Sequence, residues 1–147
     1  MKRIILMLTF CSSVASFGQK AEVENTVKTF FDGFHAKDTV KIKSVCHEKM
    51  MLQSITEGQK GSRLTDEKTS EFFKSFSTFP KEMKFEERIL GYNIQIDGAM
   101  ANAWTPYEFY VNGKLSHSGI NSFTMILESG SWKIVHIIDT RRKNKGS

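Results

Sequence analysis

The chain has 147 residues, of which 39% are hydrophobic and 25% are charged, an ordinary composition for one globular domain with a single core. Its formal net charge of +5 does not indicate a nucleic-acid-binding protein, because the basic residues are not distributed over a face. Two of them precede the first apolar run, and four more gather at the tail: Arg141, Arg142, Lys143 and Lys145. We therefore expect no nucleic-acid partner.

The first 18 residues have the pattern of a secretory signal peptide. Two basic residues precede a short apolar run, and small residues suit cleavage after Gly18. The run is too short to span a bilayer. Lipidation of Cys11 is a less favoured alternative, because the bulky Phe10 precedes it. We predict an exported protein, periplasmic or secreted, with a single domain over residues 19–147 and no membrane attachment after cleavage.

At the start of this domain, apolar residues recur at the spacing of an α-helix. A first helix has an apolar face formed by Val23, Val27, Phe30, Phe31 and Phe34. Asp38 is a good N-cap for a short second helix, whose apolar stripe contains Ile42, Val45 and Cys46. Because Cys46 is the cysteine that remains after signal cleavage, we expect a buried thiol rather than an internal disulfide.

A strand and a third helix are predicted next. Residues 50–56 are a strand candidate, and the two glycines within 58–61 indicate a turn or exposed loop. Thr65 and Asp66 are predicted to cap the third helix, which Pro80 ends. The apolar face of this helix consists of Phe72, Phe73, Phe76 and Phe79.

The C-terminal half is typical of four long strands joined by tight turns. The predicted strands cover residues 83–97, 99–112, 114–128 and 131–142. Asp97-Gly98 and Asn112-Gly113 are strong hairpin signals, and Ser129-Gly130 is a weaker one. Pro106 indicates a bulge or an edge position. Three helices followed by this meander predict an α+β fold, in which a strongly curved, mostly antiparallel sheet forms a cone with a pocket.

Several of these segments resemble the nuclear transport factor 2-like superfamily, also called SnoaL-like or cystatin-like cone proteins. The resemblance covers nearly all of the domain and rests on residues 23–34, 89–98, 101–104 and 130–135. Residues 104–110, 116–123 and 139–142 resemble, more narrowly, the secreted branch labelled putative lumazine-binding. The superfamily contains binding and transport modules as well as enzymes such as ketosteroid isomerase and scytalone dehydratase. The resemblance therefore implies a pocket and a homodimer through the sheet, but not a reaction.

Alternation along the strands predicts which side chains line the pocket. In the third long strand, the more apolar face contains His117 and Asn121, so both are expected to point inward. In the first long strand, the more apolar face contains Arg88 and Tyr92, which we place toward the mouth.

Other candidates come from residue type and position. Trp104 and Tyr107 are suited to stacking on a flat ring, and His47 lies where the second helix gives way to a strand. Each ligand candidate has a structural alternative. These alternatives are a hydrogen-bonded His117, an Arg88–Glu86 or Arg88–Glu108 surface pair, a Trp104 in the core or at a dimer interface, and an Asp139–Arg141 ion pair.

We predict a small-molecule-binding protein whose ligand is a flat aromatic or heterocyclic compound. The alternative is an isomerase, dehydratase or hydrolase whose general base is a His–carboxylate pair. The candidates for such a pair are His117, His47, Glu108 and Asp139. A third hypothesis is a cone filled by its own side chains. The four histidines have no short metal-ligand spacing, and there is no Gly-rich phosphate loop, so we expect neither a metal nor a cofactor.

Overall fold

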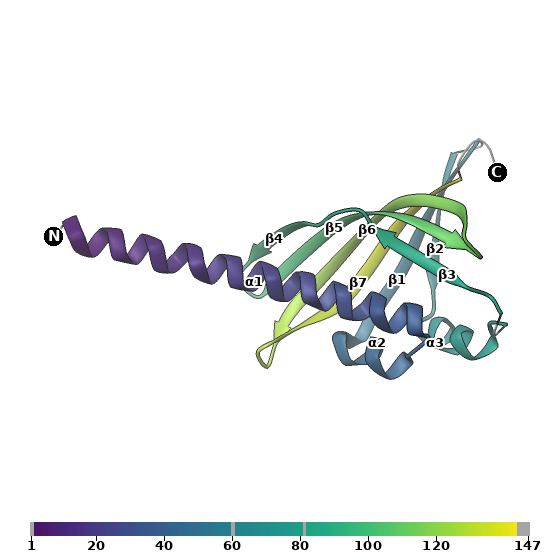
Figure 1. Cartoon of the computed structure of the whole chain (residues 1–147), viewed down its shortest axis with the longest axis horizontal. Helices are drawn as coiled ribbons and strands as arrows, with labels where there is room; N and C mark the ends of the chain where they lie inside the picture. Colours follow the sequence, from purple (N-terminus) through teal and green to yellow (C-terminus); the bar gives the residue numbers. More distant parts are fainter. Residues whose placement is uncertain (1, 60, 81, 144–147) are drawn as a thin grey trace.

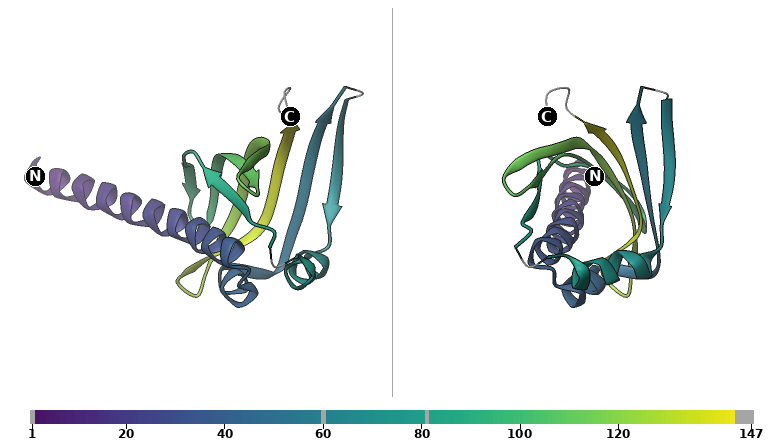
Figure 2. Two further views of the ribbon diagram at one scale, coloured as in Figure 1. Left: turned by 45° about the vertical axis from the view of Figure 1, so that its right-hand side comes forward. Right: turned by 90° about the vertical axis from the view of Figure 1, so that its right-hand side faces the viewer.

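A computed structural model describes residues 2–59, 61–80 and 82–143, with side chains described from residue 18 onward. In chain order the elements are α1 (Lys2–Ala36), α2 (Thr39–Val45), β1 (Cys46–Gly58), β2 (Gly61–Glu67), α3 (Thr69–Thr78), β3 (Phe85–Ile89), β4 (Asn93–Asp97), β5 (Met100–Val111), β6 (Lys114–Glu128) and β7 (Ser131–Lys143). The sheet curls around the C-terminal part of α1, with α2 and α3 at one end (Figures 1 and 2). This arrangement confirms the predicted α+β cone.

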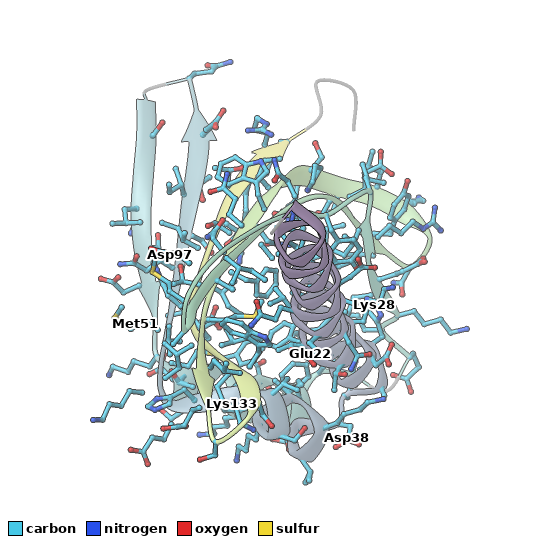
Figure 3. The ribbon with its side chains drawn as sticks, turned by 90° about the vertical axis from the view of Figure 1, so that its left-hand side faces the viewer. Glu22, Lys28, Asp38, Met51, Asp97 and Lys133 are labelled. Atoms are coloured by element: carbon cyan, nitrogen blue, oxygen red, sulfur yellow. The ribbon has the colours of Figure 1, made fainter. Side chains whose placement is uncertain are left out.

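The sheet has the strand order β2-β1-β7-β6-β5-β3, and β4 also pairs with β5. Every pairing is antiparallel except that of β1 with β7, which is parallel. Consequently β3 and β4 follow one another along the same edge of β5. Viewed along α1, side chains from the helix and from the sheet extend into the space between them (Figure 3).

The helices form largely as the apolar spacing predicts. The α1 face that packs on the sheet contains Val23, Val27, Phe30 and Phe31, all buried. Asp38 caps α2 as expected, because its Oδ1 accepts hydrogen bonds from the amides of Val40 and Lys41, both at 3.0 Å. Cys46 follows α2 as a half-buried free thiol, and burial raises its pKa to about 12.

The start of the third helix was predicted wrongly. Thr65 and Asp66 belong to β2, and α3 begins only at Thr69, after an N-cap Lys68 that makes no side-chain capping bond. Strand β2 carries no apolar alternation, and all seven of its residues are exposed. It forms because it pairs antiparallel with β1 over its whole length, and the neighbouring strand supplies that stabilisation. Strand β1 is itself longer than the predicted 50–56 segment.

The predicted strand over residues 83–97 is also divided in two. Ile89 pairs with Tyr107 and Asn93 with Trp104, so three edge residues oppose two residues of β5. The extra residue lies opposite Pro106, whose carbonyl accepts a bond from the Leu90 amide at 2.8 Å. The one-residue insertion reverses the alternation of faces between β3 and β4. This reversal explains why the predicted inward face is correct for β4 and wrong for β3.

A close approach of two strands bends the sheet at Gly119 of β6. A Cβ atom built there would lie 1.7 Å from the carbonyl oxygen of Thr140 on β7, so no larger residue fits without displacing the backbone. The Ile120 amide instead donates to the Thr140 hydroxyl at 3.0 Å. At two hairpins both turn residues have positive φ, as type I′ turns require: Asn112-Gly113 and Ser129-Gly130.

Candidate functional site

A cavity of about 370 Å³ lies between α1, α3 and the inner face of the sheet. Its apolar wall is mostly aromatic and comprises Phe30, Phe31, Phe34, Phe72, Phe76, Phe79, Phe85, Phe109 and Phe123, together with Leu52, Met83, Val111 and Ile137. Its polar side chains are Gln53, Ser54, Glu67, Ser75, Glu87, Tyr107, His117, Asn121, Asp139 and Arg141. An apolar cavity of this size with a few converging polar groups is typical of a small-molecule site.

Asp139 on β7 is the hydrogen-bonding centre of the polar side chains, and it is only 8% exposed. Arg141 donates from Nε to Asp139 Oδ2 at 2.8 Å and from Nη2 to Oδ1 at 3.4 Å. The Ser54 hydroxyl donates to Oδ1. Both carboxylate oxygens are therefore occupied, and the predicted Asp139–Arg141 ion pair is present.

Tyr107 on β5 reaches the same carboxylate across β6, the strand between β5 and β7. Its hydroxyl donates to Asp139 Oδ2 and to the Thr140 carbonyl oxygen, each at 3.0 Å, so the two acceptors share one proton. Burial, reinforced by the negative charge of Asp139, raises the pKa of Tyr107. The phenol therefore stays protonated and donates a hydrogen bond.

Glu87 on β3 is a pocket carboxyl group with one free oxygen. The Asn121 side-chain amide donates to Oε1 at 2.6 Å, whereas Oε2 has no hydrogen-bond partner among the described residues. The Glu87 backbone amide donates to His35 Nε2 at 2.9 Å, which fixes the strand against α1. Burial raises the pKa of Glu87 to about 7, against the opposing effect of the Asn121 hydrogen bond.

His117 on β6 lies flat against Phe109, with ring centroids 4.9 Å apart, and its edge meets the Tyr107 ring. Its Nδ1 is 3.2 Å from the Ser116 hydroxyl. Burial and, secondarily, the positive charge of Arg141 lower the pKa of His117. The imidazole is therefore neutral at neutral pH and can donate or accept a proton toward the cavity.

The structure thus brings together four of the residues that the sequence singled out: Tyr107, His117, Asn121 and Asp139. It places the other five elsewhere. Arg88 points outward because the extra residue within 90–92 reverses which side chains of β3 face the pocket, relative to those of β4. On the outer face it pairs with Glu86 at 2.9 Å and covers the Tyr110 ring. Trp104 is 49% exposed on the outer face of β5, opposite to the pocket.

The remaining three candidates also lie outside the cavity. Tyr92 is half-buried beneath the Lys28 ammonium group of α1. His47 lies 3.9 Å from Glu128, beside the turn of the β6–β7 hairpin, and Glu108 accepts a bond from the Tyr110 hydroxyl at 2.7 Å. Among the described residues, none of the predicted His–carboxylate pairs is joined by a hydrogen bond, so that form of general base is not assembled.

Six polar side chains of the pocket were not among the predicted site residues: Gln53, Ser54, Glu67, Ser75, Glu87 and Arg141. For Glu87 a signal was present, because Phe85 and Ile89 flank it at a spacing of two and give β3 its own apolar face. This signal was missed because residues 83–97 were treated as one strand with a single alternation of faces. Although three carboxyl groups line the cavity, no three His, Cys, Asp or Glu side chains in the described ranges converge to hold a metal ion.

The same fold occurs in solved structures of low sequence identity. A conserved protein from Planctomyces limnophilus is 12% identical, with a TM-score of 0.69 over 87% of this chain and 99% of that one. An NTF2-like protein from Cytophaga hutchinsonii is 12% identical, with a TM-score of 0.67 over 84% and 98% of the two chains. A cystatin-like protein of unknown function from Nostoc punctiforme is 12% identical, with a TM-score of 0.64 over 84% and 90%. These similarities show the fold alone, which is the cone fold of NTF2-like and cystatin-like proteins.

The particular family follows from the sequence match. Residues 18–137 match the family described as "Putative lumazine-binding", and the chain belongs to this family. No curated protein matches the chain.

Proposed function

We propose that this protein binds a small, flat aromatic or heterocyclic molecule inside the cone. The observation that supports this most directly is the cavity of about 370 Å³, because it combines a phenylalanine wall with a cluster of polar side chains. The aromatic wall favours a planar ligand, and the polar groups fix its orientation. The description of the family as lumazine-binding points to the same kind of compound.

Binding is tested with the neutral fluorescent probe N-phenyl-1-naphthylamine and full-length protein. We expect saturable fluorescence enhancement, and we expect Phe109→Trp, which fills the cavity, to weaken it at least tenfold. Trp104→Phe, on the outer face of the same strand, serves as the control and keeps wild-type binding. Enhancement that survives Phe109→Trp but is lost in the control would place the probe on the outer surface and contradict the proposal.

A native mass spectrum of protein purified from its own host complements the probe. A mass above that of the chain identifies the natural ligand, and His117→Ala is expected to lose it while retaining the folded charge-state distribution. Unfolding of His117→Ala would instead assign this histidine a structural role.

A second candidate function is acid–base catalysis on the bound molecule. Glu87 favours it, because a carboxyl group with a pKa of about 7 and a free oxygen in a cavity is suited to transferring a proton at neutral pH. If the protein is an enzyme, the host-derived ligand is converted to a product on incubation. Glu87→Gln is then expected to retain the ligand and to abolish the conversion.

We also propose export. The family match begins at residue 18, and among the side chains described from there onward the first buried residue of α1 is Val23, so we expect cleavage after Gly18 to leave these core residues in place. The predicted signal peptide itself lies at residues 1–18, where side chains up to residue 17 are outside the described part. In the part that is described, no helix has both the length and the apolar character needed to span a membrane. N-terminal sequencing of the protein from culture fluid or periplasm tests this: export and a first residue of Gln19 are expected.

A further inference from the structure

We propose that the pocket selects a flat ligand that carries a basic nitrogen, and that Glu87 and Asn121 together recognise it. The ligand class is an amino-substituted heteroaromatic ring bound as its cation. This inference rests on the proposed small-molecule function and specifies its ligand.

The first argument is the charge balance of the pocket wall. Among the described lining residues are three carboxyl groups, Glu67, Glu87 and Asp139, and one guanidinium, Arg141. Arg141 donates through both Nε and Nη2 to Asp139, so its charge is already matched. An anionic ligand would therefore add negative charge to a wall that already has an excess of it, whereas a cation would neutralise Glu87.

The second argument is the set of free acceptors. The Asn121 amide nitrogen donates to Glu87 Oε1, which leaves Glu87 Oε2 and Asn121 Oδ1 without hydrogen-bond partners among the described residues. Asn121 is only 5% exposed, and both side chains line the cavity. Two acceptors held together in a largely buried site suit the two N–H donors of an amino group on a protonated heteroaromatic ring.

The third argument is the aromatic surroundings of this carboxyl group. Glu87 is in register with Phe109 on the adjacent strand, and Phe109 is in register with His117 on the next. The aromatic row continues from Phe109 to Phe85 at 6.4 Å between centroids. Aromatic faces attract a cation electrostatically, and the neutral His117 does not oppose it.

Because Glu87 gains and loses a proton near neutral pH, this proposal predicts that the affinity for a cationic ligand depends on pH. The titratable or charged groups around it are His35 from α1, Glu67 from β2, Tyr107 from β5, His117 from β6, and Asp139 and Arg141 from β7. With a pKa of about 7, the carboxylate fraction of Glu87 rises steeply between pH 6 and pH 8. A ligand that stays protonated over this range should therefore bind about tenfold more tightly at the higher pH.

The test uses three bicyclic probes of similar shape: 4-aminoquinoline, which is a cation, 1-naphthylamine, which is neutral, and 1-naphthoate, which is an anion. Affinities of the full chain are measured by calorimetry at pH 6 and pH 8. At pH 8 we expect 4-aminoquinoline to bind about tenfold more tightly than 1-naphthylamine, and 1-naphthoate to bind most weakly. Glu87→Gln should abolish this preference by weakening the binding of 4-aminoquinoline. Glu86→Gln, which alters the exposed neighbour on the same strand, should retain it.

The outcomes separate the two proposals. Binding of 1-naphthylamine without any preference for the cation leaves the small-molecule function in place and overturns the selection of a basic nitrogen. A preference that persists in Glu87→Gln overturns the role of Glu87. Failure of all three probes to bind contradicts the small-molecule function itself. If Glu87→Gln does not fold, the pH dependence of the wild-type protein decides, because higher affinity for 4-aminoquinoline at pH 6 than at pH 8 excludes a carboxylate partner.

Discussion

At the scale of single residues, two carboxyl groups with opposite roles line the pocket from β3 and β7, which are separated by two strands of the sheet. Asp139 has both oxygens occupied by Arg141, Ser54 and Tyr107, so it is held as a charged structural centre. Glu87 accepts a hydrogen bond from a neutral amide at one oxygen and forms no ion pair with another described residue. The difference in partners explains why Glu87, and not Asp139, is available to a ligand.

Asp139→Asn should destabilise the protein by about 2–3 kcal/mol, because it leaves the partly buried Arg141 without its matching charge. Urea denaturation at pH 7 measures the free energy of unfolding. Asp32→Asn is the comparison, since it removes an exposed ion pair with Lys41 and should cost less than about 1 kcal/mol. Equal losses in the two variants would show that the buried network does not contribute beyond a surface pair.

The raised pKa of Glu87 predicts that the free energy of unfolding falls as the pH rises. The folded pKa of about 7 lies above the ordinary value of 4.5, so the folded state binds the proton more tightly than the unfolded state does. The associated stability is fully present below about pH 4.5 and is lost as the pH rises through about 7. Glu87→Gln should therefore unfold at higher urea than wild type at pH 8, by up to about 3 kcal/mol, and differ little at pH 4.5. An identical pH dependence in both proteins would contradict this, and Glu86→Gln is the matched control.

At the scale of elements, the site depends on irregularities in otherwise regular strands. The extra residue between β3 and β4 turns Glu87 inward and Arg88 outward. The close approach at Gly119 leaves the Thr140 carbonyl free to accept the Tyr107 hydroxyl, which connects β5 to β7 across β6. A uniformly paired sheet would make neither connection.

Gly119→Ala should be strongly destabilising, by about 3 kcal/mol, because its Cβ would lie 1.7 Å from a backbone oxygen that cannot move independently of β7. Thermal unfolding followed by circular dichroism measures the effect. Gly91→Ala is the matched control, since a Cβ there meets no atom within 4 Å, and it should change stability by less than about 0.5 kcal/mol. A wild-type melting temperature for Gly119→Ala would refute the close approach.

At the scale of the whole molecule, the cone has an inner face that forms the pocket and an outer face that carries exposed apolar side chains. Trp104 is in register with Ser122 and Ile138 across three strands, and Met100 is in register with Ile126. Trp104 and Met100 are 49% and 54% exposed. We propose that a second copy of the chain covers this face in a homodimer, because burial of these side chains would remove apolar area from water.

Trp104→Lys should convert such a dimer into a monomer without unfolding it, because a charge would then have to be buried in the interface. Sedimentation velocity at several concentrations measures the mass, and circular dichroism confirms folding. Leu90→Lys, an exposed apolar side chain away from the centre of this face, is the control and should remain dimeric. A monomeric wild-type protein would rule out the proposed dimer.

The sequence by itself determined the features that depend on a few neighbouring residues. Apolar spacing predicted the buried face of α1, Asp38 capped α2 as expected, and the Asn112-Gly113 and Ser129-Gly130 turns formed hairpins. Strand alternation also placed His117 and Asn121 on the inner face correctly, since the pairing of β6 with β5 is regular between these two residues.

Only the tertiary structure decided the rest. Strand β2 has no apolar pattern and exists through its pairing with β1, and the inward position of Glu87 depends on an insertion that is visible only opposite β5. The convergence of Glu87, Asn121 and Asp139, from three strands, depends on how far the sheet curls. Curl and register arise from contacts between segments that are distant in the chain, so local patterns cannot encode them.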